Sequence, residues 1–63
     1  MEMPVQTRLR LARGDRSREE VALVCDISVS ALSMYENGQR VPRDEIKVKL
    51  ARCYGKTVEE LFY

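Results

Sequence analysis

The fold is decided by residues 17–40, SREEVALVCDISVSALSMYENGQR. This stretch predicts two short helices joined by a tight turn and closed by a glycine stop. Ser17 and Glu20 have the spacing of a capping box, in which each side chain satisfies a free backbone N–H of the other residue. Ser28 is a good N-cap for the second helix, and Gly38 favours the left-handed backbone that ends it.

The residues between the two helices suit a sharp corner. Asp26 tolerates the left-handed conformation better than most residues. Ile27 can pack on Leu32 as a hydrophobic staple, which fixes the angle at which the chain enters the second helix. That helix is predicted over residues 29–36, with Leu32 and Tyr35 on its inner side.

A further helix is predicted before this stretch. Pro4 suits the first turn of a helix that ends near Arg13. Its inward residues recur at spacings of four and three, and they are Val5, Leu9 and Ala12.

Two more helices are predicted after it. Arg43 or Asp44 opens a helix that ends at Gly55, and its inward residues are Ile46, Leu50, Ala51 and Tyr54. Thr57 and Glu60 form a second capping box, which opens a short helix that closes the core through Val58, Leu61 and Phe62. No segment alternates like a strand, so the predicted fold class is all-α, a compact five-helix bundle.

The composition limits the kind of protein. Sixty-three residues predict one domain, residues 1–63, and the 44% apolar fraction is typical of a globular chain. The longest apolar run, residues 21–25, is too short for a membrane span or a signal peptide. We therefore expect a soluble, cytoplasmic protein with no membrane partner.

Residues for metal binding or catalysis are scarce. Histidine is absent, and Cys25 and Cys53 lack the close paired spacing of zinc sites. Buried, reduced thiols with no metal and no cofactor are the expectation. A serine or cysteine nucleophile would lack a base, and no glycine-rich phosphate loop is present. The sequence therefore predicts no catalytic residue and no enzyme.

Charge is unevenly distributed along the chain, although the net charge is only +1. Residues 1–18 carry five arginines and two acids, residues 19–39 carry four acids and no base, and residues 40–63 carry six bases and four acids. Any surface that binds phosphate must therefore be local, and it must use the segments that flank the central helices.

With these elements in place, the sequence resembles the phage-repressor or Xre-type helix-turn-helix family of transcriptional regulators. The resemblance covers nearly the whole chain, and the segments that carry it are Leu9-Arg10, Glu19-Glu20-Val21-Ala22, Ile27-Ser28-Val29-Ser30, Leu32-Ser33-Met34-Tyr35-Glu36-Asn37-Gly38, Pro42, Leu50-Ala51, Gly55 and Glu60-Leu61-Phe62. It implies a bundle of the lambda-repressor-like DNA-binding type, in which the second helix of the central pair enters the major groove of DNA.

The resemblance also implies which residues touch DNA. Base contacts are expected from Val29, Ser30, Ser33 and Met34. Phosphate contacts are expected from Arg18, Ser28, Asn37, Gln39, Arg40 and Arg43. Arg18 stands where the family usually has glutamine, so its phosphate role is retained and its second contact, to the recognition helix, is left open. Two of the base-contact residues are apolar, which predicts modest direct readout with a contribution from DNA shape.

The family has an internal ion pair between an arginine and a glutamate. Arg10 and Glu36 resemble this pair, which would lock the first helix to the end of the recognition helix. The loop at residues 14–16 looks one residue longer than usual, so Arg13 remains a rival for the arginine position.

Apolar residues outside the expected core suggest self-association. Leu23 and Val24 stand where relatives often carry polar residues. One of them can extend the core, but if both are exposed they mark an interaction surface. The C-terminal Leu61, Phe62 and Tyr63 are the predicted dimer interface. Twofold pairing would place two recognition helices about 34 Å apart, one turn of DNA.

These inferences predict a sequence-specific regulator of transcription that binds double-stranded DNA. Repression is favoured over activation, with residues 28–37 inserted into the major groove of DNA by a homodimer and no small-molecule ligand. A protein-interaction module, an antitoxin and a restriction-modification controller remain alternatives, because all of them use the same compact fold and fold alone does not determine function.

Overall fold

The computed structural model describes residues 3–63, and in that part the chain forms five helices and no strand. The helices are α1 Val5–Arg13, α2 Arg18–Cys25, α3 Val29–Glu36, α4 Asp44–Tyr54 and α5 Val58–Phe62. The predicted all-α, five-helix fold class is therefore confirmed. Residues 1 and 2, with which the expected domain begins, lie outside the described part.

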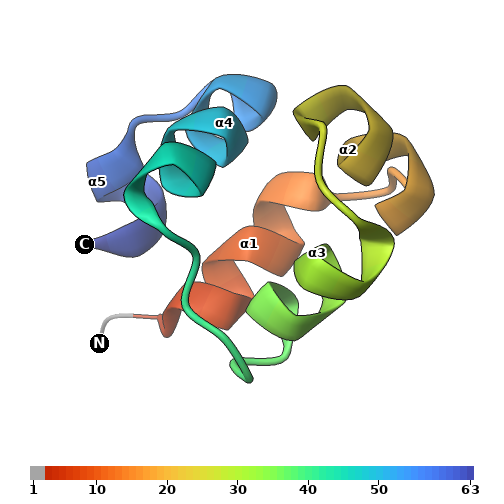
Figure 1. Ribbon diagram of the computed structural model, residues 1–63. Coiled ribbons are helices and arrows are strands. Elements are labelled where there is room, and N and C mark those ends of the chain that lie inside the picture. Colours follow the sequence, from red (N-terminus) through yellow and green to blue (C-terminus); the bar gives the residue numbers. More distant parts are fainter. Residues whose placement is uncertain (1–2) are drawn as a thin grey trace.

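Helix α1 runs through the middle of the bundle (Figure 1) and packs against both α3 and α5. Helix α2 packs against α3 and α4, and α4 packs against α5. The central pair α2 and α3 therefore rests on α1 and α4, which fixes the position of α3. Among residues 3–63, no helix combines the length and the hydropathy of a membrane span.

Helix α3 ends in the glycine stop that the sequence predicts. Gly38 has φ 72°, and a Cβ there would lie 3.2 Å from Gln6 Nε2. The Gln39 N–H donates to the Met34 carbonyl at 2.9 Å, and the Gly38 N–H donates to the Tyr35 carbonyl at 3.3 Å. These two bonds satisfy carbonyls that the end of the helix would otherwise leave free.

The corner between α2 and α3 uses the left-handed backbone without a glycine. Asp26 has φ 56° and ψ 48°, and it is the one non-glycine residue with positive φ in the described chain. The Ile27 N–H donates to the Ala22 carbonyl at 3.0 Å, which closes the corner. Ile27 itself packs against the core, as expected of the staple position.

The helix starts are capped by hydroxyl side chains. Ser28 Oγ accepts a bond from the Ala31 N–H at 3.0 Å, and Ser17 Oγ accepts one from the Glu20 N–H at 3.1 Å. Both halves of a capping box form at Thr57, the N-cap of α5. At Ser17, the bond observed from the predicted capping box is the one that the serine side chain accepts from the Glu20 N–H. Caps of this kind each stabilise a helix by about 1 kcal/mol.

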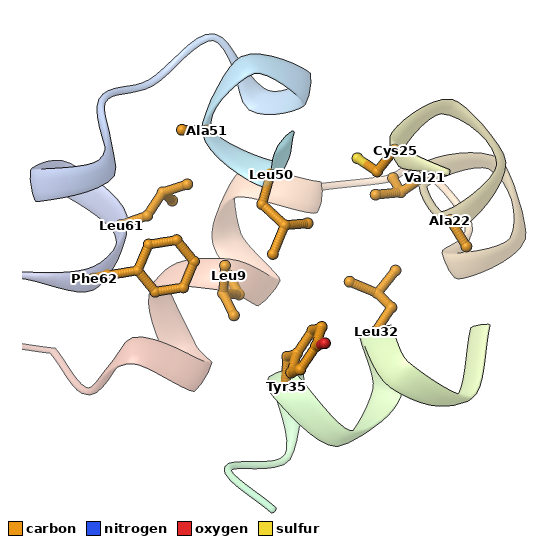
Figure 2. Close-up of a cluster of buried hydrophobic side chains, with 10 residues drawn as sticks. All are labelled: Leu9, Val21, Ala22, Cys25, Leu32, Tyr35, Leu50, Ala51, Leu61 and Phe62. Carbon is orange, nitrogen blue, oxygen red and sulfur yellow. The ribbon is translucent and has the colours of Figure 1, made fainter. Parts of the chain in front are cut away.

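All five helices contribute to one hydrophobic core (Figure 2). Its buried members are Leu9, Val21, Ala22, Cys25, Leu32, Tyr35, Leu50, Ala51, Leu61 and Phe62. Leu9, Leu32 and Leu50 have no exposed surface at all, and they come from α1, α3 and α4. The recognition helix predicted from the sequence is therefore anchored by its inner side chains.

The predicted dimer interface at the C-terminus is wrong for two of its three residues. Leu61 and Phe62 are buried in the core, which confirms their predicted role in closing it, because α5 turns them inward against α1 and α4. Tyr63 is exposed, and its hydroxyl accepts a hydrogen bond from Lys47 Nζ at 3.0 Å. The most exposed neighbouring apolar side chains lie instead on α2, where Leu23 is 83% exposed and Val24 is 73% exposed.

Candidate nucleic-acid interface

The outer side of α3 is uncharged and accessible. Val29 is 40% exposed, Ser30 is exposed, and Ser33 and Met34 are half-buried. Residues 29, 30, 33 and 34 share one side of the helix, because positions three and four apart on a helix are neighbours. The opposite side, with Leu32 and Tyr35, is the buried one. The side chains predicted to contact bases therefore lie together on the accessible side of α3.

The C-terminal end of α3 carries a fully buried carboxylate, Glu36. Arg13 binds it with two hydrogen bonds, from Nε to Oε2 at 2.8 Å and from Nη2 to Oε1 at 3.1 Å. Arg18 adds a third bond, from Nε to Oε1 at 2.9 Å. Two guanidinium groups therefore compensate the buried carboxylate. Such compensation is needed because burying a charge is costly unless the charge is paired and hydrogen-bonded.

This arrangement corrects the predicted ion pair between Arg10 and Glu36. The rival residue, Arg13, occupies the arginine position, and Arg18 joins it. Arg13 is the last residue of α1, one turn beyond Arg10, and it lies beside the last residue of α3. The hydrogen bond to Glu36 raises the pKa of the Arg13 guanidinium, against the lowering effect of burial.

Arg10 lies at the surface and contacts the next residue of the loop. Its Nη2 donates to Asn37 Oδ1 at 3.2 Å, and Asn37 Nδ2 donates to Ser33 Oγ at 3.4 Å. These bonds connect an exposed arginine on α1 to the uncharged side of α3. Sequence reasoning missed this exposed position of Arg10, and the long loop at residues 14–16 was the signal that could have revealed it.

Arg18 connects α2 to the end of α3. Its Nε is occupied by Glu36, whereas a guanidinium has five N–H groups and the side chain is only partly buried. The contact with the recognition helix that the resemblance left open is therefore made to Glu36. The remaining N–H groups are those available for a phosphate.

The loop after α3 carries the other predicted phosphate residues. Asn37, Gln39, Arg40 and Arg43 are all exposed. Neither arginine of this loop forms an ion pair within residues 3–63. Arg40 and Arg43 border the same hollow beside Tyr35 of α3. Ser28, at the other end of α3, is exposed, and its hydroxyl keeps its proton available while it accepts the bond that caps the helix.

A helix, a left-handed corner and a second helix with an accessible uncharged side define a helix-turn-helix domain of the DNA-binding type. Near the end of the second helix lie Arg40 and Arg43, which form no ion pair with the described residues. The helix-turn-helix family model matches residues 8–61. The chain therefore belongs to this family, the Xre-type helix-turn-helix regulators, and is a DNA-binding protein of the transcription-regulator class. No curated protein and no solved structure matches the chain.

Proposed function

We propose that this protein is a sequence-specific repressor that acts as a homodimer. Each subunit places residues 28–37, which include α3, in the major groove of double-stranded DNA. The observation that carries the proposal is the accessible, uncharged side of α3, which is held in place by the buried Glu36 and its two arginines. An antitoxin or a restriction-modification controller would bind DNA through the same surface.

Base recognition is assigned to four side chains. Val29 and Met34 offer apolar contacts, which suit the methyl group of thymine, and Ser30 and Ser33 can donate to or accept from several base edges. A bidentate contact to guanine needs an arginine or a lysine, and α3 has neither. We therefore expect a site in which thymine is preferred at the Val29 and Met34 contacts and DNA shape adds to the selectivity.

Phosphate binding is assigned to exposed or partly exposed polar side chains around α3. The proposed residues are Arg18, Ser28, Asn37, Gln39, Arg40 and Arg43, and Arg10 joins them because its guanidinium is exposed beside Asn37. Each phosphate neutralised by a cation contributes about −0.9 to the slope of log K against log salt. Local arginines can thus bind DNA although the chain is nearly neutral.

A homodimer is proposed because one α3 reads only a short site. A twofold pair would present two recognition helices about 34 Å apart. Leu23 and Val24 supply an exposed apolar pair for such a contact, in place of the buried Leu61 and Phe62. Sedimentation tests the pairing: a strict monomer at high micromolar concentration that still binds its site tightly would refute it.

The experiment for the whole proposal is selection of bound sites from random DNA, followed by binding measurements with charge-reversed variants. Arg40→Glu should weaken binding to the selected site. Lys56→Glu, which has the same change of charge on an exposed residue after α4, should bind nearly as well as the unmodified protein. Palindromic enrichment would support the homodimer, and a strong guanine preference at the Val29 or Met34 contacts would contradict the proposed readout.

A protein-interaction module is the second candidate function. The observation that favours it is the exposed pair Leu23 and Val24 on α2. In that case Arg40→Glu would leave the activity unchanged, whereas Leu23→Glu would abolish it. Failure of selection to enrich any DNA, together with capture of a partner that depends on Leu23, would establish this function instead.

A further inference from the structure

Two cysteines that are far apart in the sequence meet in the folded chain. Cys25 is the last residue of α2, and Cys53 lies in the last turn of α4, which packs against α2. Both side chains border one hollow of the surface, together with Val24, Asp26, Lys49 and Arg52. Figure 2 shows the Cys25 sulfur on the side of its helix that faces α4. Both thiols are free.

The two thiols differ in their access to solvent. Cys25 is only 4% exposed, and its burial and the adjacent Cys53 thiol raise its pKa to about 12. Cys53 is half-buried, so it is the more exposed of the two residues that line the hollow. A buried thiol is inert toward solvent oxidants, whereas an accessible one reacts through its thiolate form. The pair thus consists of a more accessible cysteine and a more protected one on the same hollow.

We propose that Cys25 and Cys53 form a thiol–disulfide site, in which hydrogen peroxide converts the two thiols into a bridge between α2 and α4. In the first step the Cys53 sulfur displaces hydroxide from peroxide and becomes a sulfenic acid, and the hydroxide and the thiol proton leave as water. In the second step the Cys25 sulfur attacks the Cys53 sulfur, an S–S bond forms, and the sulfenic oxygen leaves as a second water with the Cys25 proton. The two sulfurs are oxidised together by two electrons, and peroxide is reduced to two molecules of water.

The bridge would act on the part of the chain that contains the recognition helix. The segment that it closes, residues 25–53, includes α3 and the following loop, which carries Arg40 and Arg43. A bridge across a segment of this length removes conformational entropy from the unfolded chain. A chain of 63 residues has a small core, so its stability would depend strongly on the oxidation state of the pair. This inference does not depend on which molecule the domain binds.

The test uses the full chain in native buffer, treated with an equimolar amount of hydrogen peroxide. Mass spectrometry should show the loss of two hydrogen atoms, and a non-reducing gel should show a monomer. The midpoint of thermal unfolding should rise by about 10 °C and return to its original value after dithiothreitol is added. Two thiols that remain free, a disulfide-linked dimer, or an internal bridge that lowers the midpoint would each overturn the proposal.

Single-cysteine variants separate the two roles. Cys25→Ser should gain oxygen at Cys53, form no internal bridge and show no rise in the unfolding midpoint. Cys53→Ser should leave the buried Cys25 thiol unmodified under the same conditions; rapid oxidation of Cys25 in this variant would contradict the assigned roles.

A further measurement does not rely on the variants being well folded. In glutathione buffers, the equilibrium constant for forming the bridge should be at least about tenfold larger in native buffer than in urea. The reason is that a bridge that stabilises the fold is itself stabilised by the fold. Equal or lower favourability in native buffer would show that the fold does not bring the two thiols together.

Discussion

Arg13 and Glu36 join the end of α1 to the end of α3 through two parallel hydrogen bonds of 2.8 and 3.1 Å. The carboxylate is fully buried and the guanidinium is largely buried. A paired set of bonds of this kind fixes orientation as well as distance. The position of the uncharged side of α3 relative to the rest of the bundle therefore depends on a buried electrostatic contact as well as on the apolar core.

Removing one partner of this contact should destabilise the fold strongly. Glu36→Ala leaves Arg13 and Arg18 without their carboxylate, and Arg13→Ala leaves a buried charge with one arginine, so each should cost about 3–5 kcal/mol of unfolding free energy. Urea denaturation measures the loss. Arg16→Ala is a matched control, because its exposed guanidinium contacts backbone carbonyls and the Tyr54 ring but forms no ion pair with a carboxylate within residues 3–63. Equal losses for Arg13→Ala and Arg16→Ala would contradict this assignment.

Residues close together in the sequence were predicted well. The glycine stop at Gly38, the left-handed Asp26 and the cap at Ser28 are confirmed, because each depends on backbone groups within a few residues. Their physical chemistry is visible in a short window of sequence, and it sets the helix boundaries that position α3.

Contacts across the bundle were predicted less well. The choice between Arg10 and Arg13 depends on how far α1 extends past the end of α3, which the loop at residues 14–16 decides. The meeting of the two cysteines depends on the packing of α2 on α4. Spacing along one helix contains none of this information.

The corner at Asp26 should be improved by glycine. A non-glycine residue in the left-handed region has a steric cost that glycine lacks, so Asp26→Gly should raise stability by about 0.5–1 kcal/mol. The exposed carboxylate lies 3.9 Å from Lys49 Nζ, and a surface pair of this kind contributes little. Thermal unfolding measures the change. Asp15→Gly, at a turn residue whose own φ is not positive, is the control and should be neutral or destabilising; a loss of stability in Asp26→Gly would refute the argument.

The capping box of α5 should make the stability of the fold depend on pH in the acidic range. The backbone and side-chain hydrogen bonds of Thr57 lower the pKa of Glu60 in the folded chain. A lowered folded pKa stabilises the protein above the unfolded value of about 4.3, and this contribution is lost as the pH falls through the folded pKa. Unfolding midpoints between pH 7 and pH 3 should therefore fall less steeply for Glu60→Gln than for the unmodified chain. Parallel curves would exclude a role for this carboxylate.

Arg10 and Arg13 lie one helical turn apart on α1, and substitutions of the two residues should change different measured quantities. Arg10 is exposed and bonded to Asn37, so Arg10→Gln should change the unfolding free energy by less than about 1 kcal/mol. If its guanidinium neutralises one phosphate, the same variant should reduce the slope of log K against log salt by about 0.9. Arg13→Gln should do the reverse, with a loss of stability and an unchanged slope for the molecules that remain folded, because its guanidinium is committed to Glu36. Binding titrations at several salt concentrations, paired with urea denaturation, measure both quantities. An unchanged slope in Arg10→Gln would remove this residue from the proposed interface and leave Arg18, Arg40 and Arg43 as its cations.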